Sequence, residues 1–248
     1  MSVIVAMSTV NVEKPMDFEL DLDGALRPGL DILGNEIIIA LKKRSRFKQN
    51  LEIYRPGLVI GHPELSLLEY ELRRVEQVHA ELGRYRYASQ EAFTDLGPVQ
   101  PIIKRPPPEN PVRDVPSRVG PRILQYYLSW IEECLEPGSH SDTFGETVTA
   151  DVAALQGISE RVNLGKYVAE FKFQQNRQAF LESKGDAEAI RRLVVNKDRE
   201  ENVLDVARQL AEHYGFDVEQ ARRIFRWKIQ LTTDVEVQYL QERLKQEA

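Results

Sequence analysis

The amino-acid sequence predicts an all-α fold in which several long helices pack together and no significant sheet is present. Hydrophobic residues recur at helical spacing along most of the 248 residues, and no segment shows sustained apolar/polar alternation bounded by hairpin turns. With 42% hydrophobic residues the chain can also bury a substantial core. We expect one helical domain over residues 1–248, with residues 1–26 as a loosely ordered N-terminal segment.

The first predicted helix covers residues 28–46. Its inward positions are Leu30, Leu33, Ile37 and Leu41. Basic residues gather at its C-terminal end, where they compensate the negative end of the helix dipole, although the cluster also resembles a weak nuclear-localisation patch. These basic residues are Lys42, Lys43, Arg44 and Arg46.

A second helix is predicted to begin with Pro63 at its first position and to carry an apolar stripe from Leu65 to Leu82, ending at Gly83. The proline-rich residues 97–121 then predict an extended connector. Such a segment could bind a proline-recognising domain, but a crossover between helices is the better interpretation.

The remainder of the chain is predicted to be helical, with polar residues capping the helix starts. The predicted elements are a helix at 120–135, a long helix capped by Thr149 and reaching about Glu182, a short helix capped by Asp186, a helix at 197–214, and a last helix capped by Asp217.

Composition excludes several classes of protein. A net charge of −6 and a pI near 5.4 argue against a dominant interaction with nucleic acid or an anionic membrane, so an anionic ligand would need a local basic pocket. The single Cys134 cannot form an intramolecular disulfide, which predicts a reducing, cytoplasmic location. The apolar run 3–7 is too short for a signal peptide, and no segment approaches the roughly 20 apolar residues of a membrane span.

Metal and nucleotide chemistry are also unsupported. The four histidines are dispersed and lack metalloprotease spacing, and the chain contains neither a P-loop nor a glycine-rich dinucleotide signature. We therefore expect no metal and no cofactor. The histidines are His62, His79, His140 and His213.

The most informative stretch places Arg161, Gly165, Val168 and Lys172 on one helical face. Eleven residues separate its two cations, which returns the helix almost to its starting azimuth, so both charges would line one groove. This spacing suits a compact dianion. Gly165 costs roughly 0.8–1 kcal/mol relative to alanine inside a helix, and this requires a packing or functional reason.

Two further polar pairs stand at i,i+4 spacing, Asn196 with Glu200 and Thr232 with Glu236. Each pair can face one ligand. A single pair of this kind usually belongs to a solvated helix face, but both pairs occur together with Arg161 and Lys172.

These residues resemble the all-helical chorismate mutases of fungi and plants, which rearrange chorismate to prephenate. The similarity is strongest over 144–244, weaker over 27–50 and 64–96, and minimal in the connector. The residues that carry it are Leu155, Gln156, Ser159, Arg161, Gly165, Lys166, Val168, Ala169, Glu170, Lys172, Asn196, Glu200, Thr232, Val235, Glu236, Val237, Tyr239 and Leu240.

The resemblance implies a role for each site residue. Arg161 and Arg27 would clamp the two substrate carboxylates, and Lys172 and Glu236 would address the ether oxygen. Glu200 would accept from the ring hydroxyl, while Asn196 and Thr232 would complete the polar wall. Since Pro28 follows Arg27 and disfavours helical backbone at the preceding residue, we expect Arg27 at a helix entrance.

The resemblance also implies a homodimer that works without cofactor in the synthesis of phenylalanine and tyrosine. Relatives are often regulated by tyrosine and tryptophan, and Arg84, Gly145 and Thr149 match parts of that effector site. By themselves, Arg84 would be a surface charge and Gly145 a turn residue. Because Gly83 and Glu146 depart from the pattern, we expect weak or absent effector control.

A second hypothesis is a helical binding or scaffold protein that keeps this fold without turnover. The complete polar set favours the enzyme, because a scaffold has no reason to retain buried charges that carry a desolvation penalty.

Overall fold

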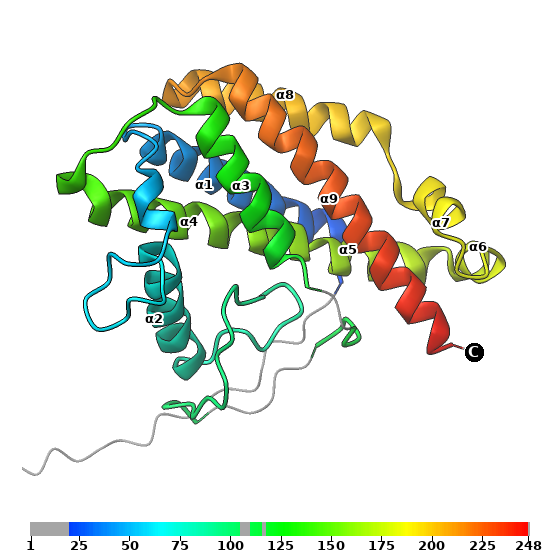
Figure 1. Cartoon of the computed structure of the whole chain (residues 1–248). Coiled ribbons are helices and arrows are strands. Elements are labelled where there is room, and N and C mark those ends of the chain that lie inside the picture. The colour runs from blue at the N-terminus through cyan, green and yellow to red at the C-terminus, as the bar shows by residue number, and fades with distance from the viewer. Residues whose placement is uncertain (1–19, 105–109, 116–117, 248) are drawn as a thin grey trace, which may run out of the picture.

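The computed structural model describes residues 20–104, 110–115 and 118–247, which form helices joined by loops and contain no strands (Figure 1). The all-α prediction is therefore confirmed. The elements of the first half are η1 (Leu22–Leu26), α1 (Arg27–Arg44), η2 (Leu51–Tyr54), α2 (Leu67–Glu81) and α3 (Gly120–Cys134). Those of the second half are η3 (Ser141–Thr143), α4 (Phe144–Asn163), α5 (Gly165–Gln175), α6 (Arg177–Glu182), α7 (Ala187–Val194), α8 (Lys197–Tyr214) and α9 (Val218–Lys245).

Helix α9 connects most of the C-terminal half, since it packs against α4, α5, α7 and α8 (Figure 1). Helix α1 lies along α4 and also touches α8. The main hydrophobic core includes Ile37, Trp130, Leu155 and Phe225. A second hydrophobic cluster contains Phe173 of α5 and residues from the C-terminal half of α9.

Local capping chemistry explains the starts of α2, α7, α8 and α9. Asp186, Asn196 and Asp217 each accept a hydrogen bond from a backbone N–H in the first turn of α7, α8 and α9. The predicted start at Pro63 is wrong: α2 begins at Leu67, after Ser66. Ser66 and Glu69 form a reciprocal capping box, which satisfies two N–H groups that Pro63 could not.

The single long helix predicted from Thr149 to Glu182 is also wrong, because the chain forms α4, α5 and α6 in its place. Helix α4 starts at Phe144, so Thr149 is an interior residue. The first interruption falls at Leu164, where α5 restarts at Gly165, and the second at Asn176, whose φ of −140° leaves the helical region.

The N-terminal prediction needs a partial correction. Residues 22–26 form the short π-helix η1, with Leu26 buried, and residues 1–19 lie outside the described part. Arg27 stands at the entrance to α1, as expected. It does so with helical φ and ψ of −63° and −48°, despite the proline that follows.

The basic cluster at the end of α1 has more specific roles than dipole compensation alone. Arg44 is fully buried, and its Nε donates to Asp151 of α4 at 2.7 Å. The Lys42 ammonium donates to the carbonyl oxygen of Gly215, at the end of α8. Tertiary partners therefore hold two of these side chains.

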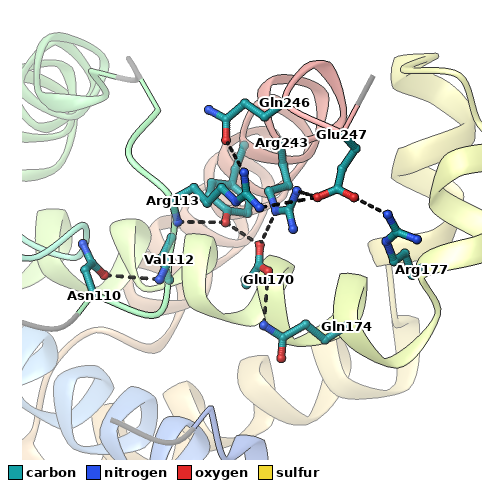
Figure 2. Close-up of polar contacts among 10 residues, drawn as sticks. Asn110, Val112, Arg113, Glu170, Gln174, Arg177, Arg243, Gln246 and Glu247 are labelled. Atoms are coloured by element: carbon teal, nitrogen blue, oxygen red, sulfur yellow. Dashed lines mark hydrogen bonds and ion pairs between the residues drawn. The ribbon is translucent and has the colours of Figure 1, made fainter. Parts of the chain in front are cut away.

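Part of the connector is fixed by charge (Figure 2). Arg113, Arg177 and Arg243 all pair with Glu247, while Arg243 also donates to the buried Glu170 at 3.2 Å. This network ties the segment at 110–115 and the end of α9 to α5 and α6. Residues 105–109 and 116–117 of the connector lie outside the described part.

No helix within residues 20–104, 110–115 and 118–247 is both long enough and apolar enough to cross a membrane.

Candidate active site

A cavity of about 150 Å³ opens where the start of α1, the end of α4, and helices α5, α8 and α9 meet. All seven residues that the sequence marked for substrate contact line it, although they come from five helices. They are Arg27, Arg161, Lys172, Asn196, Glu200, Thr232 and Glu236. Apolar side chains close the remaining wall, namely Leu22, Leu30, Val168, Val194, Val203 and Ile229.

Arg161 belongs to the last turn of α4 and is only 8% exposed. Its Nε donates to the carbonyl oxygen of Leu30 at 3.2 Å, which orients the guanidinium and leaves the terminal nitrogens for another acceptor. Burial lowers the pKa of Arg161 to about 10, opposed by the charge of Asp31. The group is still a cation at neutral pH and suits a carboxylate.

Arg27 is half-buried at the cavity edge and pairs with Asp23 one turn earlier. An approaching dianion would compete with Asp23 for this guanidinium. Arg27 therefore lines the cavity as expected, but with a partner that the sequence did not indicate.

Lys172 and Glu236 form the charged pair on one wall. The Lys172 Nζ donates to Glu236 Oε2 at 2.7 Å and to the carbonyl oxygen of Val194 at 2.7 Å. An ammonium carries three N–H donors, so these two bonds leave one for a ligand oxygen.

Burial raises the pKa of the Glu236 carboxyl, and the nearby Glu200 raises it further. Lys172 and Arg161 act in the opposite direction. The net direction is upward, which favours the protonated form more than at an exposed glutamate. A protonated Glu236 can donate a hydrogen bond as well as accept one.

The two i,i+4 pairs face the same cavity from α8 and α9. Asn196 has a local role as well, since its Oδ1 accepts from the backbone N–H of Arg199 and caps α8 at 2.9 Å. The Thr232 hydroxyl donates to the carbonyl oxygen of Lys228 at 2.8 Å, which leaves its oxygen able to accept. Glu236 is buried and Thr232 is half-buried, whereas Asn196 is exposed and Glu200 is half-buried, so the α8 pair also faces solvent.

Gly165 has a packing role. A Cβ at this position would stand 2.8 Å from Thr232 Cγ2, and Gly165 itself does not line the cavity. Its neighbours on the predicted stripe, Arg161, Val168 and Lys172, do. The glycine therefore lets α5 approach α9 closely enough to bring the side chains of both helices to one site.

Two cavity-lining cations were missed by sequence reasoning, Lys228 and Arg199. Lys228 precedes Thr232 by one helical turn on α9, so the spacing that singled out Thr232 and Glu236 could have identified it. Arg199 adjoins Glu200 and forms an ion pair with Asp31 at 3.3 Å.

The residues that matched an effector site do not meet within one chain. Arg84 donates to Glu160, near the end of α4, at 3.0 Å, whereas Gly145 and Thr149 lie in its first two turns. Gly145 and Glu160 are fifteen residues apart, about 22 Å along the helix. A single chain therefore does not assemble this site.

No group of three or more histidine, cysteine, aspartate or glutamate side chains is placed to hold a metal ion within the described ranges. The cavity offers cations, hydrogen-bond donors and a carboxyl with a raised pKa. This arrangement can hold a small dianion and stabilise charge that develops on an oxygen.

Comparison with known proteins points to one family. The family model described as chorismate mutase type II matches residues 145–237. The chain is 31% identical to the chorismate mutase of Schizosaccharomyces pombe over 84% of this chain and 90% of that protein. It is 29% identical to the chorismate mutase of Emericella nidulans over 93% and 98% of the two chains.

Solved structures agree as well. A chorismate mutase from Candida albicans, solved in complex with L-Trp, is similar with a TM-score of 0.84 and 26% identity, covering 91% of this chain and 92% of that one. The chloroplast chorismate mutase of Zea mays shares the fold, with a TM-score of 0.84 at 24% identity, over 94% of this chain and 98% of that one.

Proposed function

This chain belongs to the chorismate mutase family and converts chorismate to prephenate, and we propose that the cavity between α4, α5, α8 and α9 is where this reaction takes place. The observation that carries the proposal is the convergence of seven polar side chains from five helices on one cavity. A scaffold without turnover would not need such a set. The family implies that the prephenate formed serves phenylalanine and tyrosine synthesis.

The reaction is a unimolecular rearrangement in which the ether C–O bond of chorismate breaks and a new C–C bond forms within the same molecule. The reaction requires no nucleophile, so the protein acts through the shape of the cavity and the electrostatic field inside it. In our proposal Arg161 and Arg27 bind the two carboxylates and hold the enolpyruvyl group over the ring. This selects the reactive conformer before the bond breaks.

The ether oxygen becomes more negative as its bond to the ring breaks. We assign the remaining N–H of Lys172 to this oxygen, because its other two donors are already used. Such a donor stabilises the transition state more than the ground state. Glu236 in its acid form supplies a second hydrogen bond, and its raised pKa supports that form.

The other polar groups orient the substrate. Glu200 accepts from the ring hydroxyl in this proposal, and Asn196 and Thr232 complete the polar wall. The cap that Asn196 makes to α8 fixes its side chain before substrate arrives.

The test is an assay of chorismate conversion, followed by loss of diene absorbance and identification of prephenate. Lys172→Ala is expected to fold and to lose on the order of 10²–10³ in turnover, the usual loss for one such donor. Lys197→Ala is the matched control, since Lys197 is exposed and outside the cavity lining. Retained turnover in Lys172→Ala would overturn the site assignment.

A cytoplasmic homodimer is the proposed form of the protein. The lone Cys134 fits a reducing compartment. The homodimer is what the resemblance to the fungal and plant chorismate mutases implies.

Effector control is proposed to be weak or absent, although the Candida albicans relative was solved with L-Trp. Arg84 is held by Glu160, and Glu146 adds an anion beside Gly145, where the carboxylate of an amino acid would approach. Addition of tryptophan or tyrosine is expected to leave the initial rate nearly unchanged. A pronounced change in the initial rate with either amino acid would contradict this.

A further inference from the structure

Lys228 is a buried cation without a partner. Its side chain lies on α9 and is 1% exposed, and its Nζ makes no hydrogen bond within the described structure. The buried Lys166, by contrast, donates to the carbonyl oxygen of Ala88 at 3.2 Å. Because a buried polar group without a partner is destabilising, Lys228 requires a reason beyond packing.

The position of Lys228 suggests that reason. Lys228, Thr232 and Glu236 follow one another at four-residue spacing and line the same cavity, over about 12 Å of helix. Lys228 stands at the end of this row near Arg161, and Glu236 stands at the end near Lys172. The lysine also borders a small adjoining recess that Asp31, Arg161 and other residues line.

Neighbouring groups do not supply the missing partner. The Nζ lies 3.3 Å from the centroid of the Phe225 ring, but a cation–π contact does not replace hydrogen bonds to an ammonium. Asp31 is close enough to attract the Lys228 charge, but its carboxylate pairs with Arg199. The amine therefore has capacity for one more acceptor.

We propose that Lys228 is an additional substrate-binding residue, whose amine turns onto the substrate carboxylate that Arg161 binds. The inference rests on the proposed function, because it requires a dianion in this cavity. The four rotatable bonds of the side chain allow the amine to leave the Phe225 ring and reach that carboxylate.

The neighbouring charges explain how the basic side chains of Arg161 and Lys228 can lie beside the same recess. Burial, and then the charge of Arg161, lower the pKa of Lys228 well below its usual value, while Asp31 opposes them. Arg199 of α8 also borders the recess, and Glu236 lies two turns along α9. The Lys228 amine therefore loses its proton more easily than an exposed lysine, and a carboxylate bound beside it would favour the protonated form.

Substrate binding should therefore take up a proton. The uptake occurs between the lowered pKa of free Lys228 and its higher pKa in the complex, so affinity declines as pH rises through that interval. Glu236 can also take up a proton when an anion binds, so its contribution must be removed before that of Lys228 is measured.

The first experiment is Lys228→Met, with Lys245→Met as the matched control at the exposed end of the same helix. We expect Lys228→Met to raise the KM for chorismate by roughly tenfold or more, as the loss of a charged hydrogen bond implies, with little change in kcat. Its Tm should rise, because an apolar side chain replaces an unpartnered amine.

The KM and the Tm of Lys228→Met together separate a role in substrate binding from a purely structural role. An unchanged KM in Lys228→Met overturns the inference, whatever happens to the Tm. Failure of the parent protein to convert chorismate would instead overturn the proposed function.

The second experiment does not depend on the folding of Lys228→Met. Prephenate binding by Glu236→Gln is measured by titration calorimetry in two buffers of different ionisation enthalpy, over a pH series upward from neutrality. Proton uptake is expected to persist in this variant and to disappear when Lys228→Met is added. No uptake by Glu236→Gln at any pH would contradict the inference.

Discussion

Two regions along α4 contain buried charges, and they differ in how fully hydrogen bonds within the chain satisfy those charges. The first region contains Arg44 and Asp151, which are both fully buried. The second is the cavity at the other end of α4, where Arg161, Lys172 and Lys228 are the corresponding cations. Both regions carry a desolvation penalty, but only the first compensates it completely within the chain.

The Arg44 region leaves no donor unused. Its Nε donates to Asp151, and its terminal nitrogens donate to Tyr54 and to the carbonyl oxygens of Phe47, Lys48 and Gln49. Asp151 also accepts from the hydroxyls of Tyr54 and Tyr127, at 2.7 and 2.8 Å. This network can stabilise the fold but offers nothing to a ligand.

The cavity region is incomplete by comparison. Lys172 has one N–H left, Arg161 has its terminal nitrogens left, and Lys228 has no hydrogen-bond partner in the described residues. Saturated buried charge indicates a structural role, and unsaturated buried charge facing a cavity indicates a binding role. Substitutions in the two regions should therefore affect different measurements.

The largest expected effect on stability is that of Asp151→Asn, which keeps the shape of the side chain and leaves the Arg44 charge unpaired. The free energy of unfolding should fall by about 3–5 kcal/mol, the usual result of breaking a buried pair. Urea denaturation measures this change. The kcat of the protein that remains folded should be retained, since Asp151 does not line the cavity.

Asp205→Asn is the matched control for that variant. Asp205 is exposed and lies 3.9 Å from Arg208 on the surface of α8. Exposed ion pairs contribute little, so stability should hardly change. Equal effects of both substitutions would contradict the structural role assigned to Asp151.

A smaller and pH-dependent effect is expected for Glu236→Gln. In the proposed mechanism the acid form of Glu236 donates to the ether oxygen, so turnover should be highest below the raised pKa of Glu236 and should decline as pH rises through it. An amide donates at every pH, so the glutamine variant should lose this decline. The measurement is kcat against pH, and an unchanged profile in the variant would refute the role of Glu236.

Sequence reasoning succeeded where local chemistry decides the structure. The caps at Asp186 and Asp217 were predicted correctly, because a side chain three residues from a free N–H needs no distant partner. It failed at Pro63, where a stronger capping box follows, and at the long helix from Thr149, where two breaks had no strong local signal.

The candidate site divides in the same way. Spacing predicted that Arg161 and Lys172 share a groove and that Thr232 and Glu236 share a face, and these residues line one cavity. The role of Gly165 was not predictable from the same stripe, because the atoms that exclude a side chain there belong to Thr232 on another helix. The same spacing could have placed Lys228 on the face of Thr232 and Glu236, but its lack of a hydrogen-bond partner among the described residues exists only in the folded chain.

The sequence by itself determined the helical class, most helix ends and the set of polar residues, since these depend on hydrophobic periodicity and on groups a few residues apart. Only the tertiary structure decided which charges are saturated and which remain open to a ligand. The saturated charges and the open charges belong to the same residue types on helices. They differ only in the hydrogen-bond partners that distant segments of the chain bring to them.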